Sequence, residues 1–342
     1  MGVTVTINHT IDSDTAEYLV KEFGHIPLKE KKAEEIVSKI KEIKSENLQN
    51  RPPIITVMGH DDHGKTSVLD VLRSTNVVSG EHGGITQHVG AYQITHKNEK
   101  ITFIDTPGHA AFTEMRARGS KLTDIVVLVV AANDGVKPQT IESIKHAKAA
   151  KVPIVVAINK CDLPDADPQK VKNQLLEYEL ISEDLSGDIL MVEISAKTKK
   201  NIDKLLESIT LQAELLNLKT DYDNKATGIV LESKIDIGRG PIANIIVTSG
   251  KLKKGDHFVC GPQWGKVRAI IDDNGKSVDE ALPSTPVEIL GISGASKSGD
   301  DFLVLDTDKE AKVLSEARIN EAQSKKGQVS LLTQDSAFKD QT

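Results

Sequence analysis

Residues 59–66 form a glycine-bounded segment whose spacing fits a loop that cradles phosphate. The segment consists of Gly59, His60, Asp61, Asp62, His63, Gly64, Lys65 and Thr66, and it matches the pattern G-x-x-x-x-G-K-[ST]. In such a loop backbone N–H groups converge on phosphate oxygens, Lys65 reaches the β- and γ-phosphates, and the Thr66 hydroxyl binds Mg²⁺. A chance glycine-rich turn is the alternative, but an apolar run before the loop and a helical pattern after it favour a nucleotide site.

A second segment follows another apolar run and has the residue types of a phosphate sensor. It consists of Asp105, Thr106, Pro107, Gly108 and His109. A carboxylate at the end of a strand beside the first loop is suited to hold Mg²⁺ through water, and the Gly108 N–H is suited to contact the γ-phosphate. A simple helix cap at Asp105 is the alternative, which the five residues together disfavour.

Two further segments are suited to recognise a base. The first consists of Asn159, Lys160, Cys161 and Asp162, and the second of Ser195, Ala196 and Lys197. The Asp162 carboxylate can accept both the N1–H and the 2-amino hydrogens of guanine, whereas adenine would leave the acid unpaired. Lys160 would stack along the base, Asn159 would tie this loop to the phosphate loop, and the second segment would offer a backbone N–H to the guanine oxygen.

The elements that must position these loops alternate in type. Short β-branched runs occur at residues 54–58, 101–104, 125–130, 153–158 and 189–194, with helical patterns between them. This alternation predicts an α/β fold with a doubly wound sheet, to which residues 91–95 add an antiparallel hairpin strand. Between residues 227 and 305, short strands separated by glycine-rich turns predict a small antiparallel β-barrel.

We therefore expect four regions. Residues 1–50 form an N-terminal helical segment or linker, with a short helix from Asp14 to Glu22 and a longer helical pattern after Pro27. Residues 51–220 form the nucleotide-binding domain, residues 221–318 form the barrel, and residues 319–342 form a polar tail.

Composition excludes several classes of protein. The 342 residues include 43 Lys and Arg against 50 Asp and Glu, so the net charge of −7 disfavours a general basic field for nucleic acid. The two cysteines, Cys161 and Cys260, are too far apart for a disulfide scaffold or zinc module. No apolar run approaches the roughly 20 residues that span a bilayer, and no targeting segment is evident, so we expect a cytoplasmic protein with no membrane partner.

The ordered motifs GHDDHGKT, DTPGH, NKCD and SAK resemble those of the translational GTPases. Within that group, GGITQHVGAY (83–92), HAAFTEMRARGS (109–120) and ANDGVKPQT (132–140) are similar to bacterial translation initiation factor 2. The barrel segments at residues 232–241, 249–256 and 291–300 are similar to that family too. The resemblance covers about residues 51–318, and a looser one extends into the first 50 residues.

The resemblance implies a Mg²⁺-dependent GTPase that uses GTP and GDP. Thr86 would join Thr66 and Asp105 in holding Mg²⁺, and His109 would position the attacking water once the ribosome orders the site. The implied partners are the small ribosomal subunit and the GTPase-activating region of the large subunit, with the factor acting as a monomer during subunit joining. The family holds initiator tRNA on a further barrel, so we expect this chain to be a fragment that does not retain that tRNA.

Two residues depart from the family pattern. Asp61 stands where the family has valine, and Asn133 stands where it has aspartate. A carboxylate at position 61 should repel the terminal phosphate. The alternative function is therefore a nucleotide-gated ribosome-binding module with little intrinsic turnover.

Overall fold

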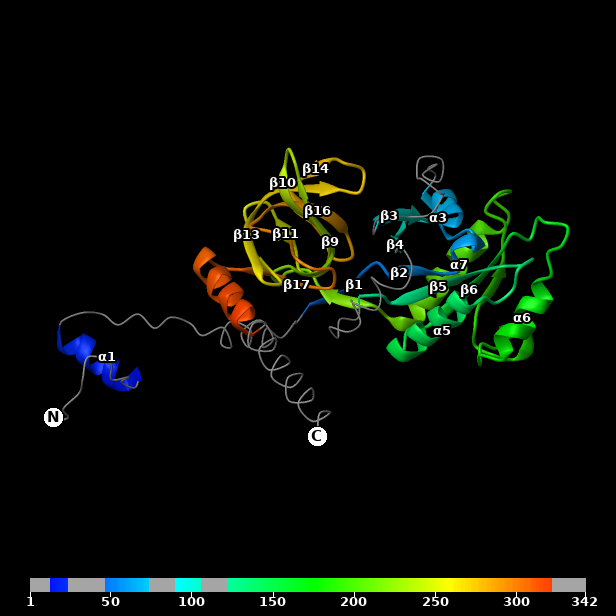
Figure 1. Ribbon diagram of the computed structural model, residues 1–342, viewed down its shortest axis with the longest axis horizontal. Helices are drawn as coiled ribbons and strands as arrows, with labels where there is room; N and C mark the ends of the chain where they lie inside the picture. Colours follow the sequence, from blue (N-terminus) through cyan, green and yellow to red (C-terminus); the bar gives the residue numbers. More distant parts are fainter. Residues whose placement is uncertain (1–12, 24–46, 74–89, 106–121, 322–342) are drawn as a thin grey trace, which may run out of the picture. The chain divides into compact units, whose positions relative to one another are not determined.

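The structure is a computed structural model that describes residues 13–23, 47–73, 90–105 and 122–321 (Figure 1). The chain divides into two units, residues 1–42 and residues 43–342. In the first unit the predicted short helix is present as α1 (Ser13–Glu22). The longer helical pattern after Pro27 and most of the predicted polar tail lie outside the described residues.

The second unit begins with a mixed six-stranded sheet in the order β3-β4-β2-β5-β6-β7 (Figure 1). Its strands are β2 (Ile54–Gly59), β3 (Gly90–His96), β4 (Glu99–Asp105), β5 (Ile125–Ala131), β6 (Ile154–Asn159) and β7 (Met191–Glu193). Strands β4, β2, β5, β6 and β7 are parallel to one another. Strand β3 pairs antiparallel with β4, as the hairpin prediction required. The direction in which successive strands are added to the sheet reverses between β2 and β5. Open α/β sheets bind ligands at such a point, beside the carboxyl ends of the strands.

Helices cover both faces of this sheet, which makes it doubly wound. The helices are α3 (Lys65–Arg73), α5 (Pro138–Ala150), α6 (Pro168–Leu176) and α7 (Ile202–Leu216). Buried side chains of α3 and α7 pack on one face, and those of α5 and α6 pack on the other. The central strands are buried along their whole length on both faces, which explains why their sequences are continuous apolar runs.

A closed antiparallel barrel follows. Six of its strands are β9 (Thr227–Asp236), β10 (Gly240–Ser249), β12 (His257–Cys260), β13 (Gln263–Asp272), β16 (Pro286–Ile292) and β17 (Asp301–Leu305). The pairing of β12 with β13 closes the order β12-β17-β9-β10-β16-β13, and β14 (Ser277–Val278) adds to its edge. The short strands β11 (Leu252–Lys253) and β15 (Glu280–Ala281) pair separately. A helix over residues 308–321 comes after the barrel and crosses the predicted boundary at residue 318.

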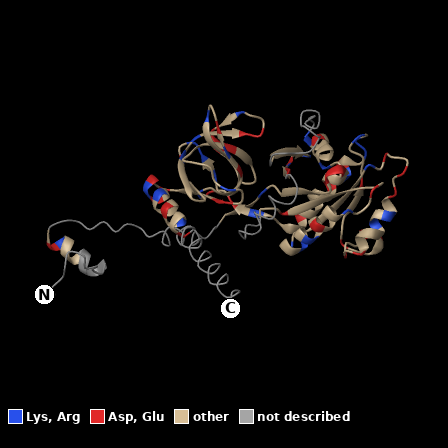
Figure 2. Ribbon diagram, in the orientation of Figure 1, with Lys and Arg blue, Asp and Glu red and all other residues tan. Residues whose placement is uncertain are grey.

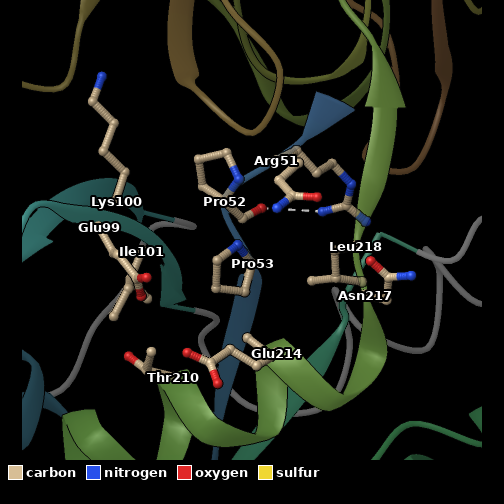
Figure 3. A pocket seen from close by; sticks show the side chains of 12 residues that line it. Arg51, Pro52, Pro53, Glu99, Lys100, Ile101, Thr210, Glu214, Asn217 and Leu218 are labelled. Carbon is tan, nitrogen blue, oxygen red and sulfur yellow. Dashed lines mark hydrogen bonds between the residues drawn. The ribbon is translucent and has the colours of Figure 1, made fainter. Parts of the chain in front are cut away.

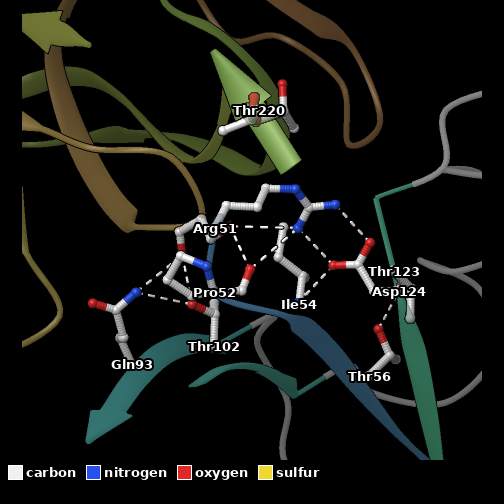
Figure 4. Close-up of polar contacts among 11 residues, drawn as sticks. Arg51, Pro52, Ile54, Thr56, Gln93, Thr102, Thr123, Asp124 and Thr220 are labelled. Carbon is white, nitrogen blue, oxygen red and sulfur yellow. Dashed lines mark hydrogen bonds and ion pairs between the residues drawn. The ribbon is translucent and has the colours of Figure 1, made fainter. Parts of the chain in front are cut away.

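Several contacts that the sequence did not suggest join the two ends of the sheet domain, connect residues within it, and link it to the barrel through Ser284. The strand β1 (Leu48–Asn50) pairs antiparallel with β8 (Lys219–Asp221). The segment that enters the sheet domain therefore lies beside the segment that leaves it. In Figure 4, the Arg51 guanidinium reaches both carboxylate oxygens of Asp124 at 2.7 Å each. The barrel residue Ser284 donates its hydroxyl to the Pro52 carbonyl at 2.7 Å, and its own carbonyl accepts from Thr102.

Charge is dispersed over the described surface rather than gathered. Figure 2 shows basic and acidic residues interspersed along both the sheet domain and the barrel. Within the described ranges, no helix has the length and apolar character needed to cross a membrane.

Candidate nucleotide-binding site

The predicted phosphate loop connects the central strand β2 to α3. The loop turns through the short 3-10 helix η1 (Asp61–His63), and both of its glycines have positive φ, 136° at Gly59 and 82° at Gly64. A Cβ atom at Gly59 would lie 2.3 Å from the Val129 carbonyl oxygen of β5, so no side chain fits there. The loop therefore has the close-packed backbone that a phosphate cradle requires.

Lys65 begins α3 and turns back into the loop. Its side chain is only 9% exposed, and its Nζ lies 2.8 Å from both the Gly59 carbonyl oxygen and Asp61 Oδ1. The ammonium group is thus positioned inside the loop, where the pattern predicted that it would meet phosphate. Thr66 follows at the first turn of α3, as its proposed role toward Mg²⁺ requires.

Gln139 in the first turn of α5 also belongs to this site, although no sequence motif predicted a role for it. Its Nε2 donates to Asp61 Oδ2 at 3.3 Å, and its Oε1 accepts from the Asp61 backbone N–H at 3.2 Å. The same Oε1 contacts His60 Nδ1. Gln139 lies inside the segment ANDGVKPQT, whose similarity to the family could have indicated a functional role. Only the fold, however, brings Gln139 to the phosphate loop.

The base-recognition segments meet the phosphate loop through Asn159 at the end of β6. Asn159 Nδ2 donates to the His63 carbonyl at 2.9 Å, and the Ala196 N–H donates to Asn159 Oδ1 at 3.1 Å. One buried side chain thus joins three predicted segments. A bound guanine that used the Ala196 N–H would have to share or replace the Asn159 oxygen.

Asp162 is held by a neighbouring hydroxyl. The Ser195 Oγ donates to Asp162 Oδ1 at 2.7 Å and accepts from the Thr198 N–H at 3.1 Å. The Ser195 hydrogen bond lowers the pKa of Asp162, so the carboxylate is ionised at neutral pH and acts as an acceptor. Lys160 adopts φ of 63°, which turns the chain sharply after β6, and Cys161 donates its thiol to the Ile158 carbonyl.

The phosphate-sensing segment is only partly described. Asp105 ends β4 and is in register with Val57 of β2, so it shares the sheet edge with the phosphate loop. Thr106, Pro107, Gly108 and His109 lie outside the described residues, and so does Thr86.

His63 is completely buried beside His60, with their ring centroids 5.0 Å apart. Burial, together with the nearby His60, lowers the pKa of His63 to about 4. The imidazole is therefore neutral at physiological pH. Its protonation is coupled to folding, because an unfolded chain would bind the proton near pH 6.5.

Acidification should destabilise the nucleotide-free chain through His63. Between pH 6.5 and 4 the unfolded state binds more protons than the folded state, so the contribution is present above pH 6.5 and is lost toward pH 4. We expect this group to account for about 2–3 kcal/mol of the free energy of unfolding, measured by urea denaturation across that range. Comparing the parent chain with His63→Leu isolates the contribution of His63. If the free energy of unfolding depends on pH identically in both proteins, His63 is not responsible for it.

A separate hollow lies at the other end of the sheet. Figure 3 shows Arg51, Pro53 and Lys100 around it together with the end of α7. These residues precede β2 or begin β4, whereas the predicted nucleotide residues follow the strands. The hollow is therefore distinct from the candidate site.

Comparisons with known proteins agree with this geometry. Residues 50–214 match the family model of the elongation factor Tu GTP binding domain, and residues 225–305 match elongation factor G domain 2. The chain is 76% identical over 342 residues to translation initiation factor IF-2 of Pelagibacter ubique, covering 100% of this chain and 47% of the relative. It is 56% identical over 329 residues to translation initiation factor IF-2 of Cereibacter sphaeroides strain ATCC 17029, covering 95% and 39%.

A solved structure is also similar. The crystal structure of GDP-bound aIF5B from Aeropyrum pernix aligns with a TM-score of 0.66 and 29% identity, covering 81% of this chain and 57% of that one. The chain spans less than half the length of the two relatives above.

Proposed function

Because this chain belongs to the translation initiation factor IF-2 family of translational GTPases, we propose that it binds GTP and GDP with Mg²⁺ and hydrolyses GTP. The observation that carries the proposal is the Asn159 bridge. Through it, Asn159 contacts the predicted phosphate loop and the second of the two segments predicted to recognise the base. The positive-φ glycines and the inward Lys65 fit phosphate, and the ionised Asp162 fits guanine.

Each predicted residue has a defined task in this proposal. The loop from Gly59 to Thr66 holds the phosphates, and Lys65 offsets their charge. Thr66, Thr86 and Asp105 would hold Mg²⁺, which supplies further charge neutralisation when bound. His109 would position the attacking water.

Asp162 and the segment from Ser195 to Lys197 would recognise the base. Asp162 accepts hydrogen bonds from the guanine edge, and Ser195 keeps the carboxylate oriented and ionised. Discrimination follows because adenine would leave the carboxylate without donors.

The alternative, a nucleotide-gated module with little turnover, is not favoured by the comparisons. The matched model is a GTP binding domain of an elongation factor, and the relatives are initiation factors over the whole chain. The Asp61 carboxylate affects the relative affinity for GTP and GDP rather than the class of reaction.

We propose the ribosome as the partner, with docking to the small subunit and to the GTPase-activating region of the large subunit. We propose that the chain acts as a monomer, because every predicted nucleotide contact comes from a single polypeptide. We propose the cytoplasm as the compartment in which it acts. We assign initiator tRNA to neither described domain, because their charges are interspersed and the chain carries a net charge of −7.

Single-turnover hydrolysis of radiolabelled GTP, with and without ribosomes, tests this function. We expect slow release of phosphate by the chain alone and a marked acceleration by ribosomes, since the water-positioning step needs the ribosome. Nucleotide binding without hydrolysis under either condition would favour the gated module. Absence of guanine nucleotide binding would overturn the proposal altogether.

A further inference from the structure

The phosphate loop contains a carboxylate that is paired with its own lysine. Asp61 Oδ1 lies 2.8 Å from Lys65 Nζ, and the lysine side chain is nearly buried while the Asp61 side chain is 42% exposed. The lysine is the cation on which the loop depends for phosphate binding. In this structure, therefore, the carboxylate accepts a charge-assisted hydrogen bond from the group that phosphate would use.

A second element holds this carboxylate in place. Gln139 of α5 donates to the other carboxylate oxygen, Asp61 Oδ2, at 3.3 Å and accepts from the Asp61 backbone N–H at 3.2 Å. One oxygen of Asp61 thus faces Lys65 and the other faces Gln139. The carboxylate is therefore held from two sides, although its side chain is 42% exposed.

The carboxylate stays charged at neutral pH. Burial raises the pKa of Asp61, but the hydrogen bonds from Lys65 and Gln139 and the charges of Lys65 and His60 together outweigh that effect and leave the pKa below its ordinary value. Its negative charge is therefore present whenever nucleotide binds near pH 7.

We propose that Asp61 determines selectivity at this site by competing with the terminal phosphate for Lys65, so that the chain favours GDP over GTP, and that Gln139 is the positioning residue for this competition. The proposal rests on the proposed guanine nucleotide function. The Asp61 charge opposes every phosphate, but the extra phosphate of GTP adds negative charge at the lysine end of the nucleotide. The penalty therefore falls more heavily on the triphosphate.

The test is the ratio of GTP affinity to GDP affinity, measured with fluorescent nucleotide analogues and Mg²⁺ at low ionic strength. We expect Asp61→Val to raise this ratio about tenfold, and Asp61→Asn, which keeps the shape without the charge, to raise it similarly. The increase should shrink at high ionic strength because the Asp61 side chain is partly exposed. Two variants of different shape guard against a folding defect in one of them.

Gln139 is tested through a double-mutant cycle. We expect Gln139→Leu to raise the ratio by a smaller factor in the parent chain and to leave it unchanged in the Asp61→Val background, because it acts only through the carboxylate. Asp134→Asn is the matched control. It removes a carboxylate that pairs with Lys137 at 3.7 Å just before α5, and it should leave the ratio unchanged.

The outcomes separate the two proposals. If neither the parent chain nor the variants bind guanine nucleotides, the proposed function fails. If all bind them with the same ratio of affinities, the proposed function stands and the role of Asp61 is overturned. Equal effects of Gln139→Leu in both backgrounds would remove Gln139 from the competition and leave Asp61 in it.

Discussion

Replacing Asp162 by asparagine is expected to lower the affinity for GTP by about 100-fold or more and to raise the affinity for xanthosine triphosphate. The carboxylate offers two acceptors to the N1–H and 2-amino hydrogens of guanine, and Ser195 holds it ionised. An asparagine amide offers one acceptor and one donor group. Its NH₂ would face the guanine 2-amino group but would pair with the oxygen at C2 of xanthine. Competitive displacement of a fluorescent guanine nucleotide measures both changes.

Asp165→Asn serves as the matched control for that experiment. Asp165 is an exposed carboxylate three positions farther along the same connection, and its loss should leave both affinities unchanged. Equal GTP binding by the parent chain and Asp162→Asn would show that Asp162 does not contact the base. In that case the guanine assignment of residues 159–162 would be wrong.

Replacing His109 by alanine is expected to lower ribosome-stimulated GTP turnover by about 10²–10⁴-fold while the dissociation constant for GTP changes little. The proposed role of His109 is to position water, and it makes no phosphate contact in the proposal. Single-turnover hydrolysis and equilibrium binding in the same variant measure the two quantities. A comparable loss of both would assign His109 to the structure of the site instead.

The sheet and barrel were predictable because local patterns in the sequence agree with the architecture. Continuous apolar runs indicated strands buried on both faces, and β5 is buried at every position from Ile125 to Ala131. Glycine-rich turns indicated short antiparallel strands, and the turn at residues 273–275 connects β13 to β14. The phosphate loop was predictable because its glycines are required by the backbone, with φ of 136° at Gly59.

Contacts between distant segments were not predictable from these patterns. Gln139 reaches the loop across 78 positions, and the Arg51–Asp124 pair spans 73, so no local spacing encodes either contact. The strand β1 has only three residues, too few to show alternation. The ion pair between Asp61 and Lys65 follows the i, i+4 spacing of the two residues in the sequence. The hydrogen bond from Gln139 to Asp61, by contrast, could be found only from the fold.

The proposal that this chain is a guanine nucleotide-dependent GTPase is tested most directly by titrating it with GTP, GDP and ATP in the presence of Mg²⁺. Isothermal titration calorimetry reports all three affinities without a label. We expect one molecule of GTP or GDP to bind per chain. ATP should bind with an affinity at least about 10³-fold lower, because adenine leaves the Asp162 carboxylate unpaired. Binding of ATP as tightly as GTP, or of neither guanine nucleotide, would contradict the account.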